Sequence, residues 1–286
     1  MAERPDLEYW VPKLAGELVG RAITGLRVAK PVVVRQAVSG ELDELARGTA
    51  IQSVARRGNF VHLHLGGPRE LELVISPMLA GRFELAEIGS KARKELAVAF
   101  ELDDGRELRY RDEVSMGKVY VLPAGDFSQA VGFERVGLDI LDPEVFTFEA
   151  FAGLADKRRD QVRVFLMDKS AIDCLGNAYA DEVLFAAGIH PKTWVRKLSQ
   201  TDLERLHRAI IDVTREAAAI IVKEKPALDV KLRDFLKVRN RHKQPCPSCG
   251  TAIRKAGVRG YDSFFCPSCQ PETRKSSIVD WRKTKR

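Results

Sequence analysis

Four cysteines near the end of the chain have the spacing of a metal site. Cys246 and Cys249 form one C-x2-C pair, sixteen residues follow, and Cys266 and Cys269 form the second pair. Each pair can place two thiolates about 2.3 Å from one Zn²⁺, and a hairpin between the pairs lets them complete a tetrahedron. Four sulfur ligands leave no open coordination position, so the sequence predicts a structural zinc ion rather than a catalytic one.

The segment between the cysteine pairs carries side chains suited to nucleic acid. It mixes basic residues, which can contact phosphates, with aromatic residues, which can stack on bases. These residues are Arg254, Lys255, Arg259, Tyr261, Phe264 and Phe265. The fifth cysteine, Cys174, has no partner at metal-ligand spacing and is expected to be a small buried hydrophobic residue.

The charge distribution also indicates a polyanionic partner. The 286 residues carry a formal net charge of +7. Fifteen basic and five acidic residues lie from Ala227 onward, so this segment carries +10 and the rest of the chain −3. The asymmetry favours nucleic acid first and an anionic membrane second, over a basic tail that only aids solubility.

Length and composition limit the class of protein. With 45% hydrophobic and 30% charged residues, the chain has enough apolar material for one large domain or two to three small ones, and disorder over most of its length is excluded. No run of eighteen apolar residues occurs, and the N-terminus carries acids where a secretion signal needs basic and then apolar residues. We therefore expect a cytoplasmic, nucleoid-associated protein.

The hydrophobic pattern predicts an α+β chain of several domains. Short β-prone runs in the first 130 residues predict an antiparallel β-sandwich, with an opening helix over residues 7–18. The expected strands cover residues 32–34, 51–54, 60–65, 70–75, 96–102, 107–111 and 118–122. Beyond Asp142 the period changes to about 3.6, which predicts helices over residues 148–154, 158–167, 177–187, 201–222 and 228–236.

These elements imply four regions. We predict a β-sandwich domain over residues 1–130, a helical domain over 131–240, a zinc finger over 241–272 and a basic tail over 273–286. Residues 124–145 would link the first two domains. Gly125, Gly132 and Gly137 mark this linker as a place where the domains could hinge.

Two further motifs, together with the order of the parts, carry a family resemblance. Residues 176–182 read GNAYADE, residues 188–191 read GIHP, and the chain opens with MAERPDLE. Over nearly its whole length, the chain resembles the formamidopyrimidine-DNA glycosylase and endonuclease VIII family. The resemblance implies a β-sandwich with flanking helices, a helix–two-turn–helix domain that binds DNA and a C-terminal four-cysteine zinc finger.

The resemblance also implies base excision from damaged double-stranded DNA. In that family the free amino-terminal amine attacks the sugar C1′ and forms a Schiff base, while the adjacent glutamate handles protons. Carried over, Met1 would be removed, Ala2 would supply the amine, Glu3 the carboxylate, and Asn177 would contact a phosphate beside the lesion. An α-amine titrates near pH 8, against about 10.4 for lysine, so more of it is an unprotonated nucleophile at pH 7.

Several positions depart from the pattern of that family. Its nucleophile is usually proline rather than alanine, its lysine after an Arg-Gly pair is Asn59 here, and its finger arginine is Tyr261, with Arg259 two residues away. Leu79 and Met116 stand where the family has residues that fill the gap left by the everted nucleotide; they could act as apolar wedges or pack in the core. The changes predict a weaker lyase step and an altered lesion range, favouring bases that are already poorly paired.

Three functional hypotheses follow. The first is a monomeric, zinc-containing DNA glycosylase with abasic-site lyase activity, favoured by Glu3 because a pure binding protein has no need of an acid beside the amino terminus. The second is a DNA-binding protein that kept the fold and lost excision, favoured by the joint replacements at Asn59, Tyr261 and Ser115, the last of which stands beside Met116 where the family has an Arg-Arg-Phe wedge. The third is a zinc-ribbon RNA-binding protein, although the predicted sheet lacks an exposed aromatic pair at alternate positions.

Overall fold

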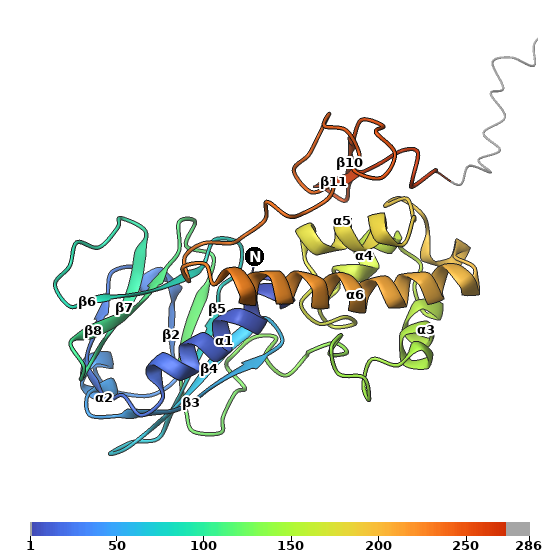
Figure 1. Ribbon diagram of the computed structural model, residues 1–286. Helices are drawn as coiled ribbons and strands as arrows, with labels where there is room; N and C mark the ends of the chain where they lie inside the picture. Colours follow the sequence, from blue (N-terminus) through green and yellow to red (C-terminus); the bar gives the residue numbers. More distant parts are fainter. Residues whose placement is uncertain (1, 273–286) are drawn as a thin grey trace, which may run out of the picture.

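The computed structural model describes residues 2–272 of the 286-residue chain, so the predicted basic tail lies outside the described residues. Figure 1 shows a β-sandwich at one end, a group of helices at the other and a small finger above the helices. Helices α1 (Arg4–Leu18) and α6 (Gln200–Glu224) pack against each other where the two lobes meet. The predicted fold class is confirmed.

The sandwich consists of a four-stranded sheet, β1-β7-β8-β6, and a five-stranded sheet, β2-β9-β5-β4-β3. Neighbouring strands are antiparallel except for β2 and β9. The apolar faces of both sheets and of α1 share one core, in which Trp10 packs edge-on against Phe83. The strands are β1 (Ile23–Val28), β2 (Val34–Gln36), β3 (Ala50–Arg57), β4 (Phe60–Gly66), β5 (Leu71–Ser76), β6 (Arg82–Glu87), β7 (Leu96–Leu102), β8 (Arg106–Arg111) and β9 (Lys118–Pro123).

Three local predictions in the sandwich are incomplete. Strands β1 and β6 were not predicted, because glycine, acids and arginines interrupt their apolar alternation. Most of the predicted strand 32–34 is a 3-10 turn, Pro31–Val33, since proline cannot donate to a strand ladder. Helix α1 begins at Arg4 rather than residue 7, because Pro5 suits a first turn and Glu3 and Asp6 form a capping box. A short helix, α2 (Leu42–Ala46), follows β2.

The helical lobe contains α3 (Phe148–Asp156), α4 (Val162–Leu166), α5 (Asn177–Ala186), the 3-10 turn Val195–Lys197 and α6. The helix predicted over 228–236 is wrong: these residues form turns and irregular backbone. Lys225 ends α6 in the left-handed conformation, Pro226 follows, and Arg233 is held by an ion pair with Asp6. Among the described residues, no helix is long and apolar enough to cross a membrane.

The predicted linker, residues 124–145, is packed against both lobes. Phe133 stacks on Phe127 with ring centroids 4.5 Å apart and meets Phe60 of β4 edge-on. Leu138 bridges to Ile172, and a Cβ on Gly137 would lie 2.4 Å from backbone atoms of the segment after α4. The glycine at 137 therefore permits close packing rather than an open hinge.

The finger contains a hairpin of β10 (Arg254–Val258) and β11 (Tyr261–Phe265). Its two turn residues, Arg259 and Gly260, both have positive φ, as in a type I′ turn. The hairpin packs beside α5, so the finger sits on the helical lobe.

Candidate nucleic-acid interface and amino-terminal site

The amino-terminal residues lie where the sandwich meets the helical lobe (Figure 1). Ala2 is fully buried, and the N–H of Arg4 donates to the carbonyl of Cys174 at 2.9 Å. Cys174 is itself buried in the core, as predicted. The beginning of the chain is thus fixed against the segment that leads into α5.

The carboxylate of Glu3 binds the start of α5. It accepts hydrogen bonds from the backbone N–H groups of Gly176 at 3.0 Å, Ala178 at 3.1 Å and Tyr179 at 3.0 Å. A helix N-terminus leaves such donors unpaired and carries a partial positive charge, so this contact stabilises the helix. A structural role therefore also explains an acid at position 3, and the presence of Glu3 does not by itself favour an enzyme over a binding protein.

The first turn of α1 is also held by the segment after α6. Arg233 donates to both carboxylate oxygens of Asp6, at 2.9 and 2.6 Å. Beside this pair, the Nζ of Lys231 is buried and has no hydrogen-bond partner among residues 2–272; it lies 5.8 Å from the ring centroid of Trp10. Burial, with a smaller contribution from the positive charge of Arg82, lowers the pKa of Lys231 to about 8.

Replacing Lys231 with methionine should stabilise the protein by about 1–2 kcal/mol at pH 7, because the fold no longer buries an ammonium. The folded-state pKa lies below the unfolded one, so the penalty is fully present below pH 8 and disappears as the pH rises toward the unfolded pKa, near 10.5. Urea unfolding at pH 7 and pH 10 measures both quantities. The exposed control Lys223→Met should show no such pH dependence, and a Lys231→Met gain that is constant with pH would contradict the assignment.

A cluster of ion pairs that the sequence analysis missed joins the two lobes. Arg56 of β3 bonds Asp173 at 2.5 Å and Asp139 at 2.6 Å, and Arg4 forms ion pairs with the same two carboxylates. Burial acts to raise the pKa of Asp139, but the N–H of Leu141, which donates to its carboxylate, and then the charges of Arg4 and Arg56 keep this pKa below its usual value. The only feature of the sequence that could have indicated this cluster was the position of Asp173, three residues before the GNAYADE motif.

A cavity of about 450 Å³ opens between the lobes next to this cluster. The sandwich contributes Asn59 and Met78, the linker contributes Arg135, and the segment after α4 contributes Lys169 and Asp173. Asn59 is 7% exposed and its amide donates to Ser76 Oγ over a long 3.4 Å. Ala2 is not among the lining residues.

The two predicted wedges, Leu79 and Met116, are 48% and 46% exposed. Neither side chain is buried in the core, which was the alternative considered for both. Large apolar side chains on loops that project from the sandwich are suited to insertion between bases.

Asn177 begins α5 with its amide oriented by a buried arginine. Arg163 is 1% exposed and donates to the Oδ1 of Asn177 at 2.8 Å and to Asp181 at 2.9 Å. The Nδ2 of Asn177 forms no hydrogen bond within residues 2–272, so it is available as a donor. Arg163 was missed in the sequence, where an arginine within an apolar stretch was the available signal.

The four cysteines have the geometry of a zinc site. Their Sγ atoms all lie within 4.8 Å of one another, with Cys246–Cys269 at 3.8 Å and Cys249–Cys266 at 3.5 Å. Tetrahedral zinc with sulfur ligands at 2.3 Å requires sulfur–sulfur distances of about 3.8 Å. The residues therefore fit the predicted structural zinc.

At the hairpin tip Arg259 is exposed in the left-handed conformation, and Tyr261 is 54% exposed.

Two acids of the GNAYADE motif attach the finger and the segment that leads into it to α5. Asp181 is fully buried and accepts from Arg163, Arg239, Ser263 Oγ and the N–H of Phe264. Glu182 accepts from three successive backbone N–H groups over residues 237–239. The motif was identified in the sequence, but these contacts were not.

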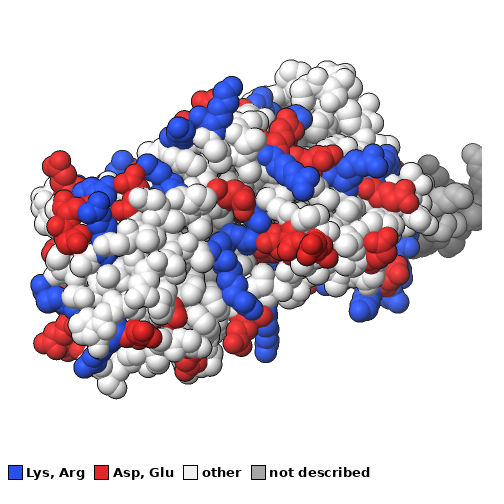
Figure 2. All heavy atoms as spheres, turned by 60° about the horizontal axis from the view of Figure 1, so that its bottom comes forward, with Lys and Arg blue, Asp and Glu red and all other residues white. Residues whose placement is uncertain are grey.

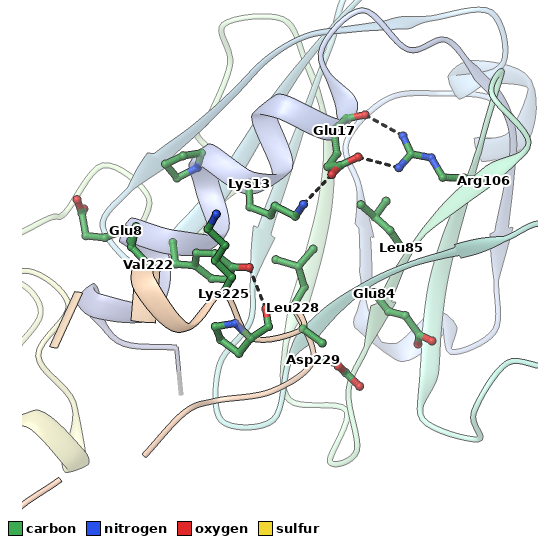
Figure 3. Close-up of a pocket in the computed structure, with 14 residues that line it drawn as sticks. Glu8, Lys13, Glu17, Glu84, Leu85, Arg106, Val222, Lys225, Leu228 and Asp229 are labelled. Carbon is green, nitrogen blue, oxygen red and sulfur yellow. Dashed lines mark hydrogen bonds and ion pairs between the residues drawn. The ribbon is translucent and has the colours of Figure 1, made fainter. Parts of the chain in front are cut away.

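A second cavity is lined by none of the predicted site residues. A cavity of about 780 Å³ lies between α1, the end of α6 and β6 (Figure 3). Three of its charged groups are paired with one another, since Glu17 binds both Lys13 and Arg106 at 2.7 Å. On the face seen in Figure 2 acidic and basic side chains alternate, without a broad region of one sign.

Comparisons with known proteins give consistent matches along the chain. The formamidopyrimidine-DNA glycosylase N-terminal domain matches residues 1–119, the formamidopyrimidine-DNA glycosylase H2TH domain residues 136–225, and the zinc finger found in FPG and IleRS residues 243–271. The formamidopyrimidine-DNA glycosylases of Pelotomaculum thermopropionicum and Bacillus subtilis are each 30% identical over 281 residues, which cover 94% of this chain and 99% of each relative. Lactococcus lactis Fpg in complex with DNA containing an abasic site has the same fold, with a TM-score of 0.83 at 24% identity over 94% of this chain and all of that chain.

Proposed function

The chain belongs to the formamidopyrimidine-DNA glycosylase family, and from this premise we propose that it is a base-excision DNA glycosylase with abasic-site lyase activity. Its substrate would be damaged or abasic double-stranded DNA, bound by a monomer. The observation that carries the proposal is the position of the amino-terminal residues, which Glu3 fixes to the start of α5 beside the cavity between the lobes.

In the proposed reaction, the α-amine of Ala2 forms the bond to the deoxyribose. The amine attacks C1′ of an abasic sugar, water leaves, and the resulting imine must be protonated before it can withdraw electrons from the sugar and allow β-elimination. Glu3 lies one peptide bond away and would move the proton. Because Ala2 is fully buried, the chemistry requires that removal of Met1 uncovers the amine.

The departures from the family would alter which lesions are excised. Asn59 and Tyr261 are uncharged where the family has basic residues, so they add no ionic contact with DNA phosphates. Less binding free energy is then available to extrude a paired base. Leu79 and Met116 would fill the gap in the stack, and Arg259 would contact phosphate from the finger tip. A non-glycine residue held in the left-handed conformation, as Arg259 is, suits a functional position.

Borohydride should trap the protein covalently on DNA that contains an abasic site, because reduction of the imine leaves a stable amine. Mass spectrometry should locate the adduct on Ala2 and show that Met1 is absent. The matched control is the same protein with its α-amine acetylated, in which we expect at least a tenfold loss of adduct because an amide nitrogen is not nucleophilic. An unacetylated, correctly processed protein that gives no adduct would refute amine catalysis.

A DNA-binding protein without excision activity is the second candidate. It is favoured by the burial of Ala2, which is not among the residues that line the cavity between the lobes. This candidate predicts retained affinity for damaged duplexes with no borohydride adduct, so the trapping experiment separates the two.

Asn177→Ala should weaken binding to all duplexes by a similar factor, about tenfold, because we propose that its Nδ2 contacts a backbone phosphate. Asn177→Asp is the matched variant: it keeps an acceptor for Arg163 but removes the donor, and it should lose at least as much affinity. Dissociation constants for undamaged, abasic and mismatched duplexes test this. A loss confined to one lesion would contradict a backbone contact.

A further inference from the structure

The segment between α4 and α5 places one unpaired cation on the wall of the cavity between the lobes. Lys169 is half-buried and lines the cavity, and the N–H of Gly137 donates to its carbonyl at 2.7 Å, which fixes the backbone to the linker. Across residues 2–272, no group lies within hydrogen-bond or ion-pair distance of its ammonium.

The acids near Lys169 are already paired. Asp168 binds Arg158 at 2.7 Å, and Asp173 binds Arg56 at 2.5 Å. Burial lowers the pKa of Lys169, opposed by the Cys174 thiol and by the carboxylates of Asp173 and Glu3. A partly dehydrated ammonium without a direct partner costs free energy, and an incoming anion would recover part of it.

The remainder of the cavity is suited to part of a nucleotide. Its walls combine apolar side chains, among them Phe60, Met78 and Met167, with a few polar groups, and its volume of about 450 Å³ lies within the range of ligand sites. Asn59 stands on the sandwich side as a neutral amide. Arg135, which is exposed and, like Lys169, unpaired within the described part of the chain, adds a second positive charge at the rim.

We propose that Lys169 binds a DNA backbone phosphate at this cavity and supplies the positive charge that Asn59 lacks. The inference rests on the proposed function only in that the ligand is DNA. An ammonium is a compact charge with rotatable donors, which suits phosphate oxygens approached from one wall.

Lys169→Gln in the full-length, zinc-loaded protein tests the inference, with a duplex containing a tetrahydrofuran abasic analogue as the probe. The slope of log Kd against log salt should fall by about 0.9, and affinity at 0.1 M salt should fall by about five- to tenfold. The exposed control Lys157→Gln should leave the slope unchanged. Adding Asn59→Lys to Lys169→Gln should restore the lost slope, which a merely structural defect would not allow.

The outcomes separate this inference from the proposed function. If Lys169→Gln does not fold, Lys169→Met removes the same charge and should show the same change in slope. A folded variant that binds the duplex with the wild-type slope overturns the role of Lys169 and leaves the proposed function intact. Failure of the wild-type chain to bind abasic duplex overturns the proposed function itself.

Discussion

Asp181→Ala should lower the free energy of unfolding by about 3–5 kcal/mol, because it leaves the buried Arg163 without its carboxylate. The same change removes the acceptor for Ser263 and Phe264, so the finger should also lose these two hydrogen bonds to α5. Urea unfolding of the zinc-loaded protein measures the loss. Asp212→Ala, at an exposed position of α6, is the matched control and should change stability by no more than about 0.5 kcal/mol. A loss below about 1 kcal/mol at position 181 would show that Arg163 finds another partner.

Cys249→Ser should abolish stoichiometric zinc binding, because its Sγ lies 3.5 Å from both Cys266 and Cys269 and the remaining three thiolates cannot complete the tetrahedron. Metal binding supplies much of the folding free energy of so small a unit, so the hairpin should lose its structure. Metal content and duplex affinity should fall together, affinity by at least tenfold as Lys255 and Arg259 lose their positions. Cys174→Ala removes the thiol outside the cluster and should retain one zinc per chain. If zinc is lost and duplex affinity is unchanged, the finger has no role in DNA binding.

Sequence reasoning succeeded where a pattern is local. Alternating apolar residues predicted most strands of the sandwich, and the two C-x2-C pairs predicted the zinc ligands that the structure brings together. It failed where the partner is distant in the chain. The three N–H groups that bind the Glu3 carboxylate lie more than 170 residues away, so position 3 could only be interpreted from its chemistry.

The segment over residues 228–236 shows the same limit. Its apolar spacing predicted a helix, but the side chains of Lys231 and Arg233 are directed to α1, where they lie against Trp10 and Asp6. These contacts fix the backbone in turns, because tertiary contacts override a weak local preference. Likewise, Lys169 was not singled out: nothing in its neighbourhood along the chain distinguishes a cavity lysine from one in solvent.

Helix α5 is ten residues long, yet it anchors both ends of the described chain. Its first turn receives the carboxylate of residue 3, and its middle receives the finger through residue 181. A protease cut within this helix would therefore disturb a contact of the amino-terminal residues and a contact of the finger at the same time. Fragments that end before α5 should consequently be poor surrogates for the intact protein, even when they include every strand of the sandwich.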